Sequence, residues 1–217
     1  MDLQAPAETP SGDVKMSGDH PIAQMPMPSC GVMSEYKEWL KAKAQTSNSE
    51  IIWDPRFKNF LSDVFSCETR VEVWDNAPLA EVIKDFMAIC LDRPRLDQGR
   101  YAVFSGGPTY GGGSRGLLWV DCTRPEPHAV FLAMVTRRRG FYCLEIYLGK
   151  QITTLALPPQ LLAAMHFWLR SHDSGDIVSI DLHDAGGYVY SLDPSHCGLE
   201  QKRVDSLKKF RSGRGAA

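Results

Sequence analysis

Residues 100–149 read RYAVFSGGPTYGGGSRGLLWVDCTRPEPHAVFLAMVTRRRGFYCLEIYLG and decide the fold. Short apolar stretches, rich in β-branched and aromatic residues, alternate there with turn residues, as strands do. The predicted strands are Arg100–Ser105, Leu117–Cys122, His128–Val135 and Phe141–Leu148. Strands joined by short turns pair antiparallel, so this stretch predicts a four-strand meander. Gly140 follows a run of arginines and provides the positive φ that the last hairpin turn favours.

Helical spacing of apolar residues surrounds the meander. Asp54-Pro55 combines an N-cap with a proline at the first helical position, so a helix is expected to begin there. The proline pair after Leu157 opens a helix that is apolar on most sides and is therefore expected to be buried. The other predicted helices span Ser34–Ala44, Leu79–Cys90 and Leu199–Phe210.

A second hairpin is predicted from Ile177–Leu182 and Tyr188–Leu192, joined by a turn that contains Gly186 and Gly187. The fold class is therefore α+β, with an antiparallel sheet of about six strands whose one face is covered by helices. Prolines and small polar residues dominate residues 1–32, which are expected to form a disordered arm. Residues 33–212 are expected to form a single α+β domain, followed by a frayed tail over residues 213–217.

The composition and charge of the chain argue against some classes of function. The chain has 217 residues, 43% of them hydrophobic, and a formal net charge of −2 at pH 7. Such a charge gives no reason to expect a nucleic-acid partner, and no apolar run approaches the length that spans a bilayer. The six cysteines show no paired metal-binding spacing, and several lie in apolar runs. We read them as buried thiols in a reducing compartment, which favours the cytoplasm. The arm is also compatible with the export signal of a secreted effector.

The segment Ser105–Gly116 contains six glycines in twelve residues. Glycine lets backbone N–H groups approach an anion closely, and serine and arginine side chains add donors. The segment joins two strands, however, whereas a phosphate-binding loop joins a strand to a helix. The simpler interpretation is a flexible hairpin loop, or a lid that orders when a partner binds. The candidate binding residues are Gly106, Gly107, Tyr110, Gly111, Ser114 and Arg115.

Glu145 lies within an apolar strand. Alternation places it with Phe141, Cys143 and Tyr147 on the less apolar face, so it most simply points to solvent. The alternative is a paired or catalytic carboxylate. Asp181 and His183 alternate on one strand and could provide two metal ligands. His166, however, lies in an apolar helix and His196 lies in a loop, which argues against a metal site. Cys30 before the first helix is a weaker candidate nucleophile, because no histidine is placed beside it.

The order of Phe104-Ser-Gly106, Leu144-Glu145, Phe167-Trp168 and a glycine turn at Gly175 resembles that in ADP-ribosyl-cyclase-like NAD hydrolases. The resemblance implies that Trp168 would stack on nicotinamide and that Glu145 would handle the ribose. Phe104 stands where those enzymes usually carry tryptophan. The pieces are short and separated, so the sequence alone assigns the chain to no family.

Two functions remain open. The first is a non-enzymatic protein-binding or regulatory module, immunity- or chaperone-like, which acts through the Gly-rich loop and an exposed sheet face. Surplus aromatic residues and an orderable loop are common at protein interfaces and favour it. No cofactor and no metal is expected in this case. The alternative is a nucleotide hydrolase of the NAD type with Glu145 and Trp168 in its pocket.

Overall fold

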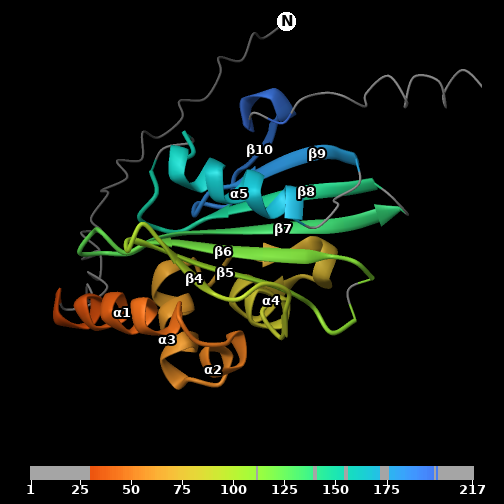
Figure 1. The fold of residues 1–217 in the computed structure, drawn as a ribbon. Coiled ribbons are helices and arrows are strands. Elements are labelled where there is room, and N and C mark those ends of the chain that lie inside the picture. Colours follow the sequence, from red (N-terminus) through yellow and green to blue (C-terminus); the bar gives the residue numbers. More distant parts are fainter. Residues whose placement is uncertain are drawn as a thin grey trace, which may run out of the picture.

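The structure is a computed structural model that describes residues 30–110, 112–138, 141–153, 156–171, 176–197 and 199. It is a mixed α+β fold built on one large sheet with helices on both faces (Figure 1). The predicted α+β class is confirmed. The prediction of about six antiparallel strands is wrong, because the sheet has eight strands and one pair is parallel. Most of the predicted arm, the helix over Leu199–Phe210 and the tail lie outside the described residues.

The meander forms the centre of the sheet. The strands run in the order β10-β9-β8-β7-β6-β5-β3, and β4 also pairs with β5. Strands β5 to β8 pair antiparallel in sequence order, which confirms the four predicted strands. Strands β3 and β4 were not predicted, because so few residues carry no alternation. The bounds are β3 Ile89–Cys90, β4 Arg95–Asp97, β5 Tyr101–Gly107, β6 Arg115–Asp121, β7 His128–Arg138, β8 Phe141–Leu148, β9 Asp176–His183 and β10 Val189–Leu192.

Helix α5, Pro159–Ser171, makes the sheet mixed. It carries the chain from the end of β8 back to the level where β8 began, so β9 runs parallel to β8. A crossover helix is the usual connection between parallel neighbours. The predicted hairpin of β9 and β10 is confirmed, and it extends the sheet at this edge.

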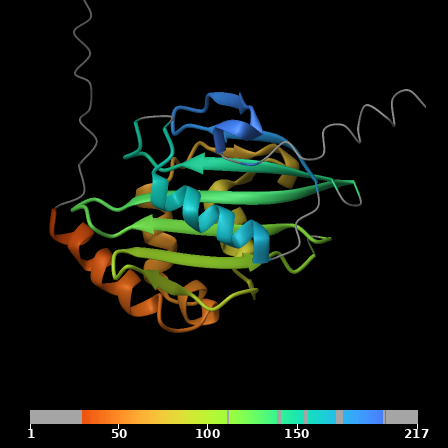
Figure 2. The same cartoon turned by 45° about the horizontal axis from the view of Figure 1, so that its top comes forward.

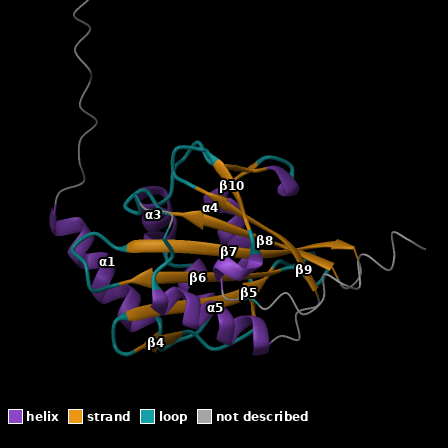
Figure 3. Cartoon of the chain, turned by 90° about the horizontal axis from the view of Figure 1, so that it is seen from above, coloured by secondary structure: helices purple, strands orange, loops and turns teal. Residues whose placement is uncertain are grey.

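Helices α1 to α4 cover the opposite face of the sheet from α5 (Figure 2, Figure 3). The expectation that helices cover only one face is therefore wrong. Asp54 caps α3 as predicted, while α1 begins earlier than predicted and includes Cys30. Helix α4 ends before Cys90, which instead pairs with β5. The bounds are α1 Cys30–Lys43, α2 Asn48–Ile52, α3 Pro55–Val64 and α4 Leu79–Phe86, with short elements β1 Arg70–Val71, η1 Glu72–Trp74, β2 Ala77–Pro78 and η2 Pro194–Cys197.

Two hydrophobic cores lie against the two faces of the sheet. Along each central strand, successive residues enter opposite cores, as Val103 and Phe104 do on β5. The first core joins the sheet to α1, α3 and α4, and the second joins it to α5. A sheet covered on both faces has near-continuous apolar strands, which explains why the meander reads as apolar runs.

Candidate acidic cleft

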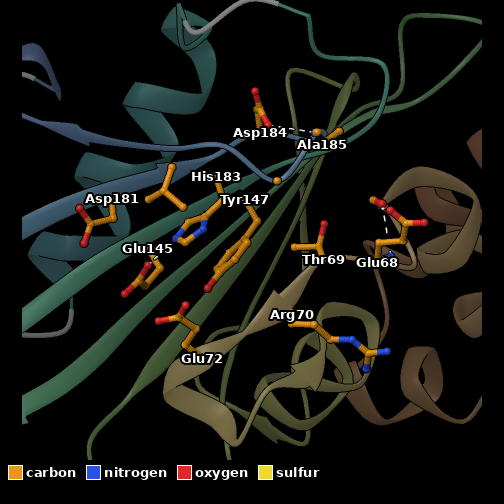
Figure 4. Close-up of a pocket in the computed structure, with 14 residues that line it drawn as sticks. Glu68, Thr69, Arg70, Glu72, Glu145, Tyr147, Asp181, His183, Asp184 and Ala185 are labelled. Carbon is orange, nitrogen blue, oxygen red and sulfur yellow. Dashed lines mark hydrogen bonds and ion pairs between the residues drawn. The ribbon is translucent and has the colours of Figure 1, made fainter. Parts of the chain in front are cut away.

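A cleft of about 490 Å³ opens on the α1–α4 side of the sheet, between strands β8 to β10 and the segment that follows α3. Figure 4 shows its sheet wall carrying Glu145, Tyr147, Asp181 and His183, with Glu72 opposite. The lining residues are Ser66, Glu68, Thr69, Arg70, Glu72, Glu145, Tyr147, Asp181, His183, Asp184, Ala185, Gly186, Gly187 and Val189.

The parallel register of β8 and β9 assembles the sheet wall. Glu145 lies opposite Asp181, and Tyr147 lies opposite His183. Residues two apart on a strand face the same side, so these four side chains share one face. The parallel pairing therefore joins residues that lie almost forty positions apart in the chain.

Glu145 and His183 form a short polar contact in the cleft. The Oε2 atom of Glu145 lies 2.6 Å from Nε2 of His183, and Glu145 is only 5% exposed. The Tyr147 ring stacks on the imidazole, with 4.4 Å between centroids and 15° between planes. The expectation that Glu145 points to solvent is wrong. Alternation assigned its face correctly, but that face of the sheet is covered as well.

Cys143 lies beside this pair. Its Sγ is 3.4 Å from Oε1 of Glu145 and 3.6 Å from Oδ2 of Asp181. It is also 2.8 Å from the Ser179 hydroxyl. The Ser191 hydroxyl donates a 2.7 Å hydrogen bond to Oδ1 of Asp181. A thiol, two carboxylates and an imidazole therefore gather on two neighbouring strands, and these are groups that ligate transition metals.

The cleft is strongly acidic. Among the described residues, its lining includes the carboxylates of Glu68, Glu72, Glu145, Asp181 and Asp184, and one guanidinium, that of Arg70. Glu72 points from the opposite wall toward Glu145, whereas the Arg70 side chain points away from Glu145 (Figure 4). Carboxylates gathered in a cleft produce a negative potential that attracts cations.

The β9–β10 turn forms one rim of the cleft. Oδ1 of Asp184 accepts hydrogen bonds from the backbone N–H groups of Gly186 and Tyr188, both at 2.9 Å. These bonds fix the turn, as aspartate side chains commonly do. The next residues are apolar and exposed, Tyr188 at 68% and Val189 at 56%. An acidic cleft thus lies next to an exposed apolar edge.

The structure does not bring Glu145 and Trp168 together. Trp168 lies on α5 and packs in the core that contains Leu144 and Ile146. Glu145 lies between those two residues on β8 and points to the other face of the sheet. A single pocket built from Glu145 and Trp168 therefore does not form.

The candidate residues of the Gly-rich loop lie in different parts of the structure. Gly106 and Gly107 belong to β5 and Arg115 belongs to β6, so the connection is shorter than predicted. Ser114 is buried, and its hydroxyl accepts a 3.3 Å hydrogen bond from the Thr136 backbone N–H. Tyr110 is 98% exposed. Gly111 lies outside the described residues.

The loop and the cleft rim lie at opposite ends of the sheet. The loop follows β5 where that strand meets the start of β6, and the rim follows the end of β9. The pairings from β6 through β8 to β9 place these two points at opposite ends of the strands. The loop is therefore a separate surface.

None of the remaining candidates whose side chains are described is among the residues that line the cleft. The His166 ring contacts the Cys197 carbonyl oxygen at 2.6 Å and is satisfied there. Burial raises the pKa of the Cys122 thiol to about 11 and also raises the pKa of Cys197, so both favour the unreactive thiol form. Cys67 and Cys90 are exposed, so the expectation of buried thiols is wrong for both. Cys30 is the first residue of α1, and its side chain is not among those described.

Sequence reasoning found part of this site. It singled out Glu145, and it paired Asp181 with His183 by alternation. It interpreted Cys143 only as a buried thiol, and it did not identify Glu68 and Glu72. The pairing of β8 with β9 brings Cys143 to Asp181, and the position of η1 brings Glu72 to the cleft. That pairing is a long-range feature with no local pattern.

Comparison of the chain with protein-family models, curated proteins and solved structures found no match. None of the helices among the described residues is long and apolar enough to cross a bilayer.

Proposed function

We propose that the chain is a non-enzymatic binding module that receives a positively charged side chain of a partner protein in the acidic cleft. The observation that carries this proposal is the excess of carboxylates, from Glu68 to Asp184, over the single Arg70 in the lining. A partner lysine or arginine placed among them gains Coulomb energy in a partly desolvated setting.

The rim supports a protein partner. Tyr188 and Val189 are exposed beside the cleft and provide apolar contact area. Aromatic residues are enriched in the cores of protein interfaces, and charged residues next to them fix orientation. On the wall opposite the sheet, the carboxylates of Glu68 and Glu72 are exposed. We therefore place the partner's cationic group between these two carboxylates and Asp184.

The test needs a partner captured from the native cell extract and then purified. The double variant Glu72→Gln and Asp184→Asn should bind it roughly tenfold more weakly, with a shallower salt dependence. The matched control is Glu81→Gln with Glu126→Gln, which removes the same charge from exposed positions outside the cleft. Equal loss in both double variants would show a general charge effect and would contradict the proposal.

A hydrolase is the second candidate, and the Glu145–His183 contact favours it. A carboxylate that holds one imidazole nitrogen orients the ring and leaves the other nitrogen for proton transfer. For a nucleotide substrate such as NAD, nicotinamide release should then disappear in His183→Gln. Because Trp168 lies on the other face, Trp168→Phe should retain the activity. An inactive wild-type protein would leave the binding module as the proposal.

A further inference from the structure

We propose that Cys143, Glu145 and Asp181 form a binding site for one Zn²⁺ ion beside the acidic cleft, whose lining includes Glu145 and Asp181. One ligand atom from each residue lies within 4.8 Å of the others. The three residues come from two adjacent strands, so the sheet itself holds their backbones in place. The site does not depend on a partner protein, because every ligand belongs to this chain.

The distances fit a tetrahedral ion. Zinc binds sulfur at roughly 2.3 Å and carboxylate oxygen at roughly 2.0–2.2 Å, so a tetrahedral site separates the two by about 3.5 Å. The Cys143 Sγ lies 3.4 Å from Oε1 of Glu145 and 3.6 Å from Oδ2 of Asp181. Two edges of the tetrahedron are therefore already formed. A thiolate among the ligands favours zinc over calcium or magnesium, which prefer oxygen.

Each ligand is also held by a residue outside the ligand set. Glu145 directs its other oxygen, Oε2, to His183 at 2.6 Å. Asp181 directs its other oxygen, Oδ1, to the Ser191 hydroxyl at 2.7 Å. Ser179 contacts the sulfur of Cys143 at 2.8 Å. Zinc ligands are commonly oriented in this way by outer hydrogen bonds.

The surroundings agree with a transition-metal site. Cys143 is 1% exposed and Glu145 is 5% exposed, so water competes weakly for the ion there. Binding converts the thiol to a thiolate and releases its proton to solvent. Three protein ligands leave one coordination position for water, which is the usual arrangement of an open zinc site.

Cobalt binding to the full chain tests the proposal, because Co²⁺ replaces Zn²⁺ in tetrahedral sites and absorbs light. The wild-type protein should bind one equivalent, show a thiolate-to-cobalt charge-transfer band, and lose that band on addition of Zn²⁺. Cys143→Ser should lose the band, and the exposed Cys67→Ser should keep it. Ser191→Ala keeps all three ligands and should weaken binding by about 10- to 100-fold.

Two controls keep the result decisive. Glu81→Gln removes an exposed carboxylate outside the cleft and should leave the cobalt spectrum unchanged. If circular dichroism shows that Cys143→Ser is unfolded, Asp181→Asn tests the same site at a less buried position. A wild-type protein without the charge-transfer band, or a band that persists in a folded Cys143→Ser or Asp181→Asn protein, would overturn the proposal. Neither outcome bears on partner binding at the rim.

Discussion

Gly106 determines how closely helix α4 approaches the sheet. A Cβ atom at this position would overlap the Phe86 carbonyl oxygen and lie 2.8 Å from the Ile89 carbonyl oxygen. Both are backbone atoms, so α4 and β3 would have to shift. We expect Gly106→Ala to lower the free energy of unfolding by about 1–3 kcal/mol, the usual cost of overpacking. Chemical denaturation measures this loss.

Gly112→Ala is the matched control for that prediction. A Cβ atom there has no neighbour within 4 Å, but the φ of 55° is in the left-handed region. The expected cost is roughly 1 kcal/mol of backbone strain, without any clash. Unfolding of Gly106→Ala at a higher denaturant concentration than Gly112→Ala would contradict the role assigned to Gly106.

The residues of β8 show how much of the site the alternation of side chains along a strand can predict. Alternation placed Glu145, Cys143 and Tyr147 on one face, and the structure has them there. The pattern did not show that this face is covered, because burial of a strand depends on what packs on it. Whether a glutamate in an apolar strand is exposed or paired depends on its neighbours in space. For Glu145 that neighbour is His183, which lies 38 positions away in the chain.

Among the elements, α3 owes its start to Asp54. Its carboxylate accepts a hydrogen bond from the Arg56 backbone N–H at 3.0 Å and from the Trp39 indole N–H at 2.9 Å. The Arg56 guanidinium, 2.8 Å away, holds the pKa of Asp54 well below its ordinary value of 3.8. We expect Asp54→Ala to lower the free energy of unfolding by about 1–2 kcal/mol near neutral pH.

The pH dependence of that loss has a definite sign. A carboxyl group whose pKa is lowered by folding stabilises the protein above its unfolded pKa, and this stabilisation disappears as pH falls through the folded pKa. The stability gap between wild type and Asp54→Ala should therefore be constant above pH 5 and shrink below about pH 3.8. Denaturation curves over this range measure it, and a gap that widens in acid would exclude this mechanism.

The β5–β6 connection carries an exposed aromatic side chain. Tyr110 is 98% exposed, so Tyr110→Ala should change the free energy of unfolding by less than about 0.5 kcal/mol. If this loop contacts the partner, affinity should fall roughly tenfold or more, as for an interface tyrosine. Trp53→Ala, at an aromatic residue that is 76% exposed, is the control. Unchanged affinity in Tyr110→Ala would exclude the loop from the interface.

The elements differ in how far the sequence could predict them. The four meander strands and the capped start of α3 carry strong local signals, and all were found. Strands β3 and β4 consist of two and three residues, and the two edge pairings with β5 hold them in place. The parallel pairing of β9 depends on where α5 returns the chain, which alternation within β9 does not encode.

At the scale of the whole molecule, the two cores share the same strands. Leu117 on β6 packs toward α5, and its neighbour Leu118 packs toward α1–α4. Disrupting one core therefore exposes one face of the strands whose other face forms the second core. This arrangement predicts that the described helices and strands unfold as one cooperative unit, although the sheet lies between the two helical layers.

Phe60→Ala on α3 and Leu161→Ala on α5 test this cooperativity from opposite faces. Each side chain is fully buried, so each substitution should cost about 2–5 kcal/mol. Hydrogen exchange should then show α3 and α5 losing protection together in both variants, because the shared sheet couples them. Loss of protection in α5 alone in Leu161→Ala, with α3 unaffected, would mean that α5 and the β9–β10 hairpin unfold separately. In that case the cleft wall formed by β9 would open while the meander stays folded.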